Sequence, residues 1–498
     1  MLSLEQVLFP SLVLIGSSII LLPVTRLLTR LWRRTRGGSL GIVCLAYLFS
    51  AVGLYWLNRT FIEQGGSSVM VSVSNDWLLG ASSSFLIDSM SIYMLFVYIL
   101  CGFATSLYGI LNIDSRRVYS ERYYSIMLIV AGCIMAASLS GDLLTLFIFW
   151  EAASAGTYML IVYGKTSQSL EASLKYFVMI IVASGLIVYG LSLIYGLTGS
   201  LNFWRIKEVL LKSESKGMLL GAFVFVIGGY AIETAIVPFH MWLPDAYTAA
   251  PASSAAFLSA LVDQGSYYVL MRILIYVLTP PFVVNWPMTL AVFSAMTMTV
   301  GNLFALIQKN VKRMVSYVCI ADIGYNLIAI TSATGLGLMA NLFFFLIGGL
   351  TTALCFMTIG ILNRHGIKDL EDFSGAGRRF PLTSAALTVA ALSFPGIPPL
   401  AGFFAKYLVF TSAIEGGMLP LALLGVMNSV IEASYFLRLI QYLFMKSPNA
   451  VREKEDLAAL VPVYLLVCLI FILGIYPTPI IDLIYPAILQ SPLRRLGL

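Results

Sequence analysis

The chain has 498 residues, of which 59% are hydrophobic and 11% are charged, with a formal net charge of +6. Soluble globular proteins carry about 25% charged residues, and the mean hydropathy of this chain is +0.91. This composition excludes a soluble enzyme, a nucleic-acid-binding protein and a secreted disulfide-rich protein. It predicts an all-α integral membrane protein, because repeated long apolar runs are typical of membrane-spanning helices.

Long apolar segments follow one another along the whole chain. They predict about 14 transmembrane helices, since a helix needs about 20 apolar residues to cross a bilayer. The predicted spans are residues 8–28, 39–58, 86–111, 123–140, 143–163, 172–197, 218–239, 252–279, 287–308, 314–333, 338–362, 382–413, 419–445 and 458–477. Between the sixth and seventh spans, residues 201–217 alternate apolar and charged side chains at helical spacing. This pattern predicts an amphipathic helix along the membrane surface.

Lysine and arginine residues concentrate in alternate loops. Clusters occupy residues 26–36, 116–122, 309–313 and 364–379. Because basic loops stay on the cytoplasmic side of a membrane, these clusters predict that both termini lie on the outer side of the cell (inner) membrane. The basic residues within 205–216 are the exception to this pattern.

The chain has few residues that bind cofactors or metals in other proteins. Its six cysteines are far apart, it has two histidines, and it contains no glycine-rich phosphate-binding motif. We therefore expect no cofactor, no resident metal, and no redox or hydrolytic site of its own. Whether the chain belongs to an enzyme complex is a question that these residues leave open.

Ionisable side chains also lie inside the predicted spans. A charge at the centre of a spanning helix costs about 2.5–3.5 kcal/mol, so these groups must face one another, water or a neighbouring subunit. The acidic ones are Glu151, Glu233, Asp263, Asp322 and Glu432, and the basic ones are Arg272, Lys406 and Arg438. Glu151, Glu233 and Lys406 are favoured as functional groups. The two arginines and Glu432 lie nearer to span ends, where a structural role or contact with the interface is favoured.

Two of the predicted spans are interrupted by proline. In the seventh span Pro238 precedes His240, and in the twelfth Pro398 precedes Lys406. Proline removes a backbone donor and frees a carbonyl group, and such openings are tolerated in a membrane where they line a cavity or pack on protein. Pro238, His240 and Pro398 are therefore candidate gating residues. Simple proline kinks, with His240 as a helix cap, are the alternative.

The two interrupted spans are five positions apart in the series, so they run in opposite directions. This spacing predicts two inverted five-helix repeats, residues 123–279 and 280–446, with broken helices that are typical of transporters. The repeats follow an N-terminal three-helix segment, residues 1–122, and precede a C-terminal span and tail, residues 447–498.

Four motifs in this order resemble one family of membrane subunits. They are residues 139–151 (LSGDLLTLFIFWE), 237–247 (VPFHMWLPDAY), 312–317 (KRMVSY) and 395–406 (PGIPPLAGFFAK). The chain is similar to the antiporter-like, proton-translocating subunits of respiratory complex I, Mrp-type Na⁺/H⁺ antiporters and membrane-bound energy-converting hydrogenases. Residues 140–142 and 195–202 resemble the Mrp D-type and hydrogenase branch most.

This resemblance implies translocation of H⁺, Na⁺ or both by one subunit of a hetero-oligomeric membrane complex, either a redox-driven pump or a cation/proton antiporter. In the family, a carboxylate on the fifth span pairs with a lysine on the seventh. Lysines and histidines then lead to a lysine or glutamate on the twelfth. By this likeness Glu151 is the fifth-span acid and Lys406 is the twelfth-span residue.

The middle of the family's path differs in this chain. Glu233 stands where the family has the seventh-span lysine, and Asp263 or Gln264 stands where it has the eighth-span lysine. Asp322 replaces a histidine of many members on the tenth span, and Gly348 replaces one on the eleventh. The path is therefore acidic or empty where the family is basic.

Two carboxylates in one buried site cannot both ionise cheaply. Glu151 and Glu233 are expected to share one proton or to hold a transient Na⁺ between their oxygens, and Asp263 and Asp322 extend them into an acidic cation path. Two alternatives remain. One is a degenerate, non-pumping scaffold or connector subunit of the same kind of complex, and the other is a stand-alone secondary transporter.

Overall fold

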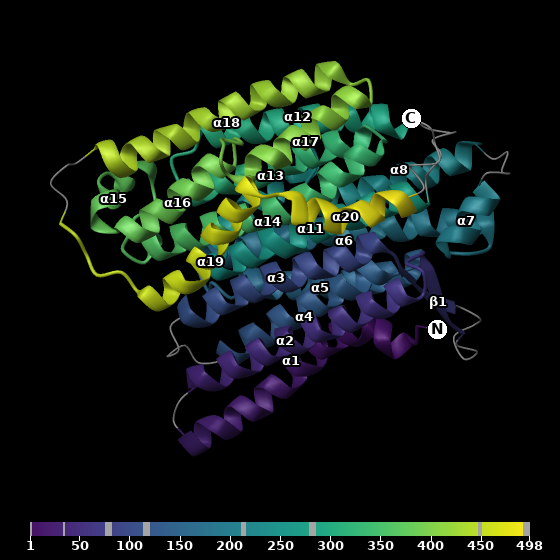
Figure 1. The fold of residues 1–498 in the computed structure, drawn as a ribbon, viewed down its shortest axis with the longest axis horizontal. Helices are drawn as coiled ribbons and strands as arrows, with labels where there is room; N and C mark the ends of the chain where they lie inside the picture. Colours follow the sequence, from purple (N-terminus) through teal and green to yellow (C-terminus); the bar gives the residue numbers. More distant parts are fainter. Residues whose placement is uncertain are drawn as a thin grey trace.

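A computed structural model of the chain describes residues 2–32, 35–74, 82–112, 120–210, 216–277, 285–446 and 451–491. Within these ranges the fold is mostly helical, as the composition predicted (Figure 1). Several positions in the predicted basic clusters and tail lie outside the described residues, namely 33–34, 116–117, 212 and 494–495.

The described elements follow in chain order. The first are α1 (Leu4–Trp32), α2 (Thr35–Glu63), β1 (Val69–Ser74), β2 (Ser82–Ile87), α3 (Ser89–Asn112), α4 (Ser120–Leu139), α5 (Leu143–Val162), α6 (Ser167–Thr198), α7 (Phe203–Leu210) and α8 (Lys216–Glu233). Next come η1 (Phe239–Met241), α9 (Trp242–Ala249), α10 (Ala252–Phe257), the π-helical turn η2 (Leu258–Val262), α11 (Asp263–Tyr276), α12 (Trp286–Ile307), α13 (Val311–Thr331) and α14 (Gly335–Asn363). The last are η3 (Leu370–Phe373), α15 (Ala376–Arg379), α16 (Pro381–Ser393), α17 (Ala401–Glu415), α18 (Leu419–Met445), α19 (Leu457–Ile475) and α20 (Thr478–Gln490).

Eleven helices in the described part of the chain are long and apolar enough to cross a membrane. They are α1 to α6, α12, α13, α14, α18 and α19. The predicted spans 218–239, 252–279 and 382–413 are also helical, but each is interrupted, two of them at the predicted prolines and the third by η2. The total of about 14 spans therefore stays a prediction.

The β-hairpin is the part of the fold that an all-α prediction missed. β1 and β2 pair antiparallel, with Val69 opposite Ile87, and valine at every second position of β1 has the period of a strand. Asp142 fastens the hairpin to the start of α5, because its carboxylate accepts a hydrogen bond from the backbone N–H of Ser84 at 2.7 Å. The third helix consequently begins at Ser89 and not at position 86.

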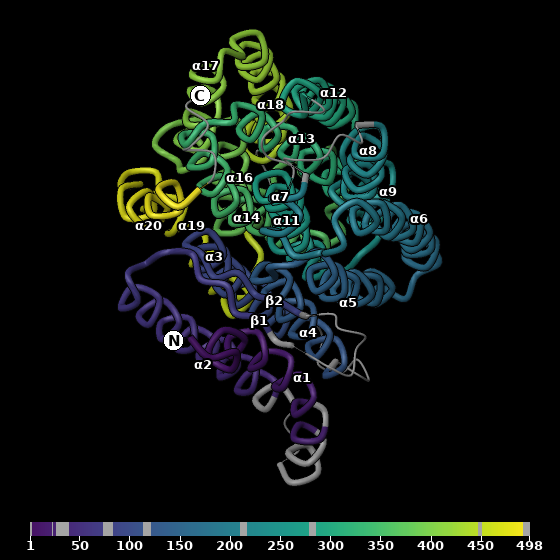
Figure 2. The backbone as a smooth tube through the Cα atoms, turned by 90° about the vertical axis from the view of Figure 1, so that its right-hand side faces the viewer, coloured from purple at the N-terminus to yellow at the C-terminus, as the bar shows by residue number. Residues whose placement is uncertain are grey.

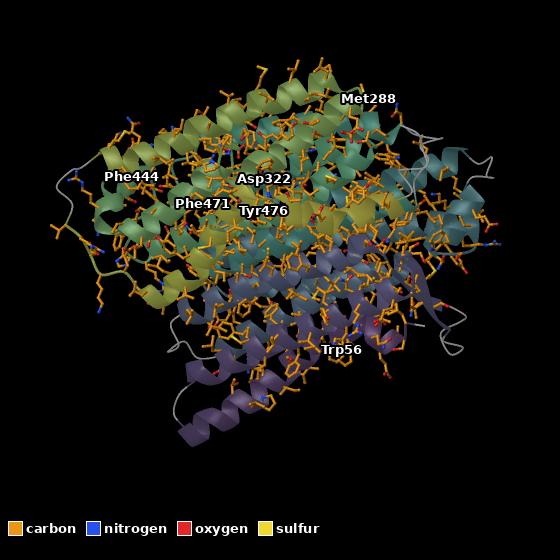
Figure 3. The ribbon with its side chains drawn as sticks, in the orientation of Figure 1. Trp56, Met288, Asp322, Phe444, Phe471 and Tyr476 are labelled. Atoms are coloured by element: carbon orange, nitrogen blue, oxygen red, sulfur yellow. The ribbon has the colours of Figure 1, made fainter. Side chains whose placement is uncertain are left out.

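Helices α13 and α14 form the centre of the bundle, and their apolar stretches are wholly buried. In Figure 2, seen from one end, α14 and α11 lie inside a ring of other helices, with α1 and α2 at one edge. The outer helices α2, α6 and α18 expose large apolar side chains such as Trp56, which Figure 3 labels at the periphery and far from Asp322. Apolar faces of this kind suit lipid or neighbouring subunits.

The short helix α7 confirms the amphipathic helix predicted within residues 201–217. Phe203 and Ile206 are buried on one face, and Trp204 is exposed on the other. The alternation of apolar and charged residues thus identified the helix, and its position along the membrane surface stays a prediction.

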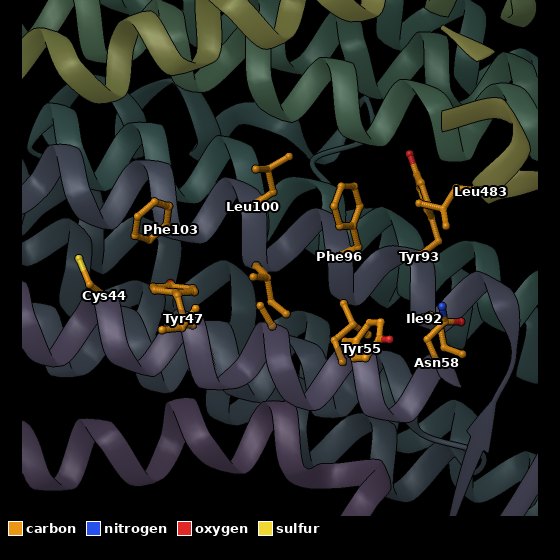
Figure 4. Close-up of a pocket in the computed structure, with 14 residues that line it drawn as sticks. Cys44, Tyr47, Tyr55, Asn58, Ile92, Tyr93, Phe96, Leu100, Phe103 and Leu483 are labelled. Carbon is orange, nitrogen blue, oxygen red and sulfur yellow. The ribbon is translucent and has the colours of Figure 1, made fainter. Parts of the chain in front are cut away.

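An apolar groove lies between α2 and α3, beside Leu483 of α20 (Figure 4). Its volume is about 630 Å³, and its lining includes Tyr47, Phe96 and Phe103. No Asp, Glu, Lys or Arg side chain lines it. The groove is therefore unsuited to ions, and the ionisable residues of the spans lie elsewhere.

Arg272 holds the hairpin and two helices together in the protein interior. Its guanidinium lies 3.4 Å from the Asp88 carboxylate and donates to the carbonyl oxygens of Leu86 at 2.8 Å and Ser140 at 3.2 Å. Tyr276 also donates to Asp88, at 2.6 Å. Arg272 is fully buried, so it makes no contact with the membrane interface. Of the two predicted roles, the structural one agrees with these contacts.

Removing one member of this buried pair is expected to destabilise the protein. The substitution Arg272→Met leaves the Asp88 carboxylate without its cation and should lower the free energy of unfolding by about 3–5 kcal/mol. Adding Asp88→Asn removes the uncompensated charge and should restore part of that loss. Thermal unfolding of the purified variants in detergent measures both effects. A double variant no more stable than the single one would contradict the electrostatic explanation.

Candidate functional site

Two predicted acids meet between α5, α6 and α8. Glu151 of α5 is half-buried and accepts a hydrogen bond from the Ser184 hydroxyl of α6 at 2.7 Å. Glu233, the last residue of α8, is buried, and its Oε1 has no hydrogen-bond partner in the described part of the protein. It lies beside Trp150 and interacts electrostatically with Glu151. The structure therefore brings these two carboxylates together.

The interruption after Glu233 makes an anion there unfavourable. The helix ends at this residue, and Ala235 adopts a left-handed backbone conformation with φ of 53°. The C-terminal end of a helix carries a partial negative charge, which adds to the charge of Glu151 and to burial. A proton or a cation at Glu233 relieves all three effects.

The segment that follows positions the predicted gating residues. Pro238 precedes the short helix η1, and the buried His240 lies within it. Both ring nitrogens of His240 are buried without a hydrogen-bond partner among the described residues. The Ile232 carbonyl, near the end of α8, accepts a bond from the indole N–H of Trp242 at 3.0 Å. Capping by His240 is thus not observed among the described residues: the backbone N–H of Ala235 and the Trp242 indole both donate to the Ile232 carbonyl.

Two tyrosines connect Glu151 and Glu233 to the next acid, Asp263. Tyr176 of α6 interacts electrostatically with Glu151 and Glu233, and Tyr247 of α9 interacts with Tyr176. The Tyr247 hydroxyl donates a short hydrogen bond to Asp263. Sequence reasoning did not select either tyrosine as a site residue. Tyr247 ends the motif at 237–247, whereas Tyr176 stands in no motif.

Asp263 and Gln264 both point into the interior, where the sequence left a choice between them. They follow the π-helical turn η2, and such turns are frequent at functional sites because they locally reorient a helix. Asp263 accepts the bond from Tyr247. Gln264 is buried with Oε1 lacking a partner within the described chain, and a methyl group at Gly348 would lie 3.6 Å from its Nε2. The glycine that replaces a family histidine leaves room for this amide.

Asp322 of α13 is buried and lines the same cavity as the twelfth-span lysine. It interacts electrostatically with Glu432, Lys406 and Asp263, and its Oδ2 is buried without a hydrogen-bond partner in the described protein. Asp322 and Lys406 line one small cavity of about 20 Å³, together with Gly348. A cavity of this size holds one water molecule.

Lys406 pairs with a carboxylate that the sequence did not favour as functional. Its ammonium forms an ion pair with Glu432 of α18, contacts the Ser429 hydroxyl at 3.1 Å and lies 3.9 Å from the ring centre of Tyr325. Glu432 is fully buried, so the expectation that it contacts the interface is wrong. Arg438, one turn and a half further along α18, is half-buried and donates to the Leu306 carbonyl at 3.0 Å.

The interruption of the twelfth span brings Lys406 into this position. α16 ends at Ser393, and α17 begins at Ala401. A methyl group at Gly402 would lie 1.8 Å from the Ser393 carbonyl oxygen, so only glycine permits this close approach. Pro398 lies in the connecting segment. Its role in gating stays a prediction.

The described residues contain no group of three or more His, Cys, Asp or Glu side chains arranged for a metal ion. Glu151 and Glu233 supply two carboxylates, which is fewer than the three side chains of such a group. Carboxylate and carbonyl oxygens are nevertheless the ligands that hard cations prefer, so a transient cation there is chemically reasonable.

The chain matches known membrane subunits along most of its length. Residues 140–432 match the family described as NADH:quinone oxidoreductase/Mrp antiporter, TM. Subunit N 2 of the NADH-quinone oxidoreductase of Koribacter versatilis is 35% identical over 80% of this chain and 81% of its own. Subunit N of the F(420)H(2) dehydrogenase of Methanosarcina mazei is 29% identical over 95% and 96%.

Solved structures agree with this assignment. A subunit of an archaeal membrane-bound sulfane sulfur reductase has a TM-score of 0.84 at 28% identity, covering 96% of this chain and 97% of its own. A subunit of Thermus thermophilus respiratory complex I has a TM-score of 0.75 at 27% identity, covering 95% and 98%. An Mrp subunit from Dietzia shares the fold, with a TM-score of 0.84 at 22% identity over 97% and 96%. The chain therefore belongs to the family of antiporter-like membrane subunits shared by NADH:quinone oxidoreductases and Mrp antiporters.

Proposed function

We propose that this chain is an ion-translocating subunit of a multisubunit redox-driven pump or cation/proton antiporter complex, and that protons are its ions. One observation supports the proposal: eight ionisable side chains inside the bundle, seven buried and Glu151 half-buried, form a row of electrostatic neighbours. In order, the row is Glu151, Glu233, Tyr176, Tyr247, Asp263, Asp322, Lys406 and Glu432, and each member interacts with a neighbour in the row. Buried ionisable chains of this kind are typical of proton relays.

The chemistry of the connecting groups favours protons over Na⁺. Tyr176 and Tyr247 lie between the acids, and a hydroxyl group both donates and accepts a hydrogen bond. The cavity between Asp322 and Lys406 is large enough for one water molecule only. A proton passes along hydroxyl groups and water, whereas Na⁺ needs several oxygen ligands at each stop. Na⁺ binding between Glu151 and Glu233 is the competing possibility.

The proposed inverted repeats place the row symmetrically. Spans four to eight correspond to spans nine to thirteen, so Glu151 corresponds to Asp322 and Glu233 to Lys406, while Asp263 corresponds to Glu432. Each repeat then has one acid on an intact span, one ionisable group beside a proline break and one acid on its last span. If the repeats hold, the path therefore has the same kind of group at equivalent positions of both halves. In the proposed orientation both termini face the outer side of the inner membrane.

The competing function is a connector subunit that moves no ions. The lack of lysines in the middle of the path favours it, since Gly348 and either Asp263 or Gln264 stand where the resemblance expects bases. A connector has no use for unpaired carboxylates, however, and each buried one is expensive. Glu233 and Asp322 each keep one buried oxygen without a hydrogen-bond partner among the described residues, which supports transport.

Replacing Glu233 by glutamine is expected to abolish proton movement and to leave assembly intact. Glutamine has the shape of the protonated acid but never releases a proton. Proton uptake by proteoliposomes that contain the whole complex, followed with a pH-sensitive dye, measures the effect. Glu171→Gln is the matched control, because Glu171 is exposed on α6, and it should pump normally. Full coupling in Glu233→Gln would refute the path.

Replacing Tyr247 by phenylalanine removes one hydroxyl group from the middle of the row. Asp263 loses its hydrogen bond, which is worth about 1.5–3 kcal/mol for a charged group. Proton movement should slow by about tenfold or more, since 1.36 kcal/mol is one factor of ten in rate. Tyr189→Phe is the control, because Tyr189 is exposed on α6. Equal rates in both variants would remove the tyrosines from the path.

Proton movement is expected to continue in medium without Na⁺. The same proteoliposomes, assayed in potassium and then in sodium buffers, should give the same initial rate of pH change. Uptake of radioactive Na⁺ that disappears in Glu151→Gln would instead establish a Na⁺ site between Glu151 and Glu233.

A further inference from the structure

Three buried ionisable groups from three helices form the end of the row. Asp322 comes from α13, Lys406 from α17 and Glu432 from α18. Their exposed fractions are 4%, 4% and 0%. One ammonium group thus stands beside two carboxylates, away from water.

Lys406 has a firm contact with only one of the two acids. Its ammonium pairs with Oε2 of Glu432 and donates to the Ser429 hydroxyl at 3.1 Å. An ammonium group has three donors, so one remains for a third acceptor. The hydroxyl of Tyr325 lies 3.4 Å from the same Glu432 oxygen, and the ring of Tyr325 faces the ammonium at 3.9 Å.

Asp322 is the other acid within reach of Lys406. Both side chains line the cavity of about 20 Å³, and the charge of Lys406 acts on Asp322. Oδ2 of Asp322 is buried without a hydrogen-bond partner among the described residues. The cavity wall also includes Gly348, Thr351 and Ser393, none of which carries a charge.

The charges of this cluster do not balance without a proton. One cation and two carboxylates leave one excess negative charge, and an uncompensated buried ion costs several kcal/mol. The other groups whose ionisation interacts with Asp322 add no positive charge; they are Asp263, Cys319, Tyr325 and Tyr435. A proton on one carboxylate makes the cluster neutral. The ion pair with Glu432 leaves Asp322 as the acid that carries it.

We propose that Lys406 is shared between Glu432 and Asp322, and that the carboxyl group without the ammonium holds the proton. This inference rests on the proposed function and names a residue, Glu432, that takes part in it. In one state Glu432 is ionised and Asp322 protonated, and in the other the roles are exchanged. During the exchange, the O–H bond of Asp322 breaks and its proton leaves through the water-sized cavity, while a proton that arrives at Glu432 forms an O–H bond there.

Both states have the same net charge, which makes the exchange feasible in a medium of low dielectric constant. In each state one carboxylate faces the Lys406 ammonium and the other carries a proton, so the charges of the cluster sum to zero. Neither state therefore carries the cost of an isolated buried charge. In the proposed exchange the ammonium moves from Glu432 toward Asp322, which lines the same cavity as Lys406, on the flexible stem of the lysine.

Infrared difference spectroscopy on the purified complex tests this exchange. A protonated carboxyl group absorbs as a C=O stretch that shifts in heavy water, and an ionised one does not. The Asp322 band is defined as the component present in the wild type and missing in Asp322→Asn. We expect Glu432→Gln to lose this same band, because Lys406 then pairs with Asp322 and ionises it. If Glu432 is only a fixed structural partner, the Asp322 band remains in Glu432→Gln.

Glu432→Asp is the second variant and keeps the test decisive if the glutamine variant does not assemble. Its shorter side chain weakens the pair with Lys406, so the Asp322 band should fall to an intermediate intensity. A band of full wild-type intensity in whichever variant assembles, or no Asp322 band in the wild type, would overturn the proposal. Proton movement in the wild-type complex is measured separately. If the Asp322 band responds to the Glu432 variants as expected but the wild-type complex moves no protons, the proposed function is refuted. The sharing of Lys406 between the two acids would still hold.

Discussion

The interior of a membrane protein offers a charged side chain neither water nor mobile counter-ions, and this constraint shapes the whole molecule. Each buried charge must have a fixed partner, a proton or a bound cation. Arg272 and Asp88 satisfy the requirement with each other, and the result is a rigid junction between the hairpin, α3 and α11. Glu233 has no ion-pair partner among the described residues, and the same constraint there favours a proton that can leave.

The difference between anchoring and transport therefore depends on how completely a buried charge is satisfied. The Asp88 carboxylate receives bonds from the Ser91 backbone, Tyr276 and Arg272, so nothing is gained by moving it. Asp263 receives a bond from Tyr247, and Asp322 keeps an oxygen without a partner in the described structure. Incomplete satisfaction raises the free energy of the resting state and lowers the cost of changing protonation.

Much of the fold could be predicted from the sequence, because a membrane leaves few choices to a backbone. Apolar runs identified the helices, and prolines identified the breaks beside Glu233 and Lys406. The hairpin was missed because its strands are six residues long, too short to outweigh the helical pattern around them. The π-helical turn before Asp263 has no sequence signature of its own. The turn packs closely on α14, since a methyl group at Gly349 would lie 3.1 Å from the Ala260 carbonyl oxygen.

The sequence predicted the acids of the candidate site but missed the residues that contact them. Their position within predicted spans selected Glu151, Glu233 and Lys406, because a charge inside the bilayer costs free energy and such residues are usually functional. Position along the chain also suggested that Glu432 contacts the interface, yet α18 turns it inward onto Lys406. Contacts between distant helices decide such roles, and one sequence does not contain them. Tyr176 was missed for the same reason, because only its neighbours across the bundle distinguish it from other tyrosines.

In the proposed path, the acidic middle changes how charge moves. A lysine carries its charge at rest, so a path of lysines holds positive charges that repel an incoming proton. A path of protonated carboxyl groups is neutral at rest and becomes negative only where a proton has left. In the proposed row Lys406 is the basic residue, and it lies next to Glu432 at one end. A proton that leaves Asp322 therefore creates a negative charge beside Lys406, where the ammonium can stabilise it, and this end of the row is where charge separation costs least.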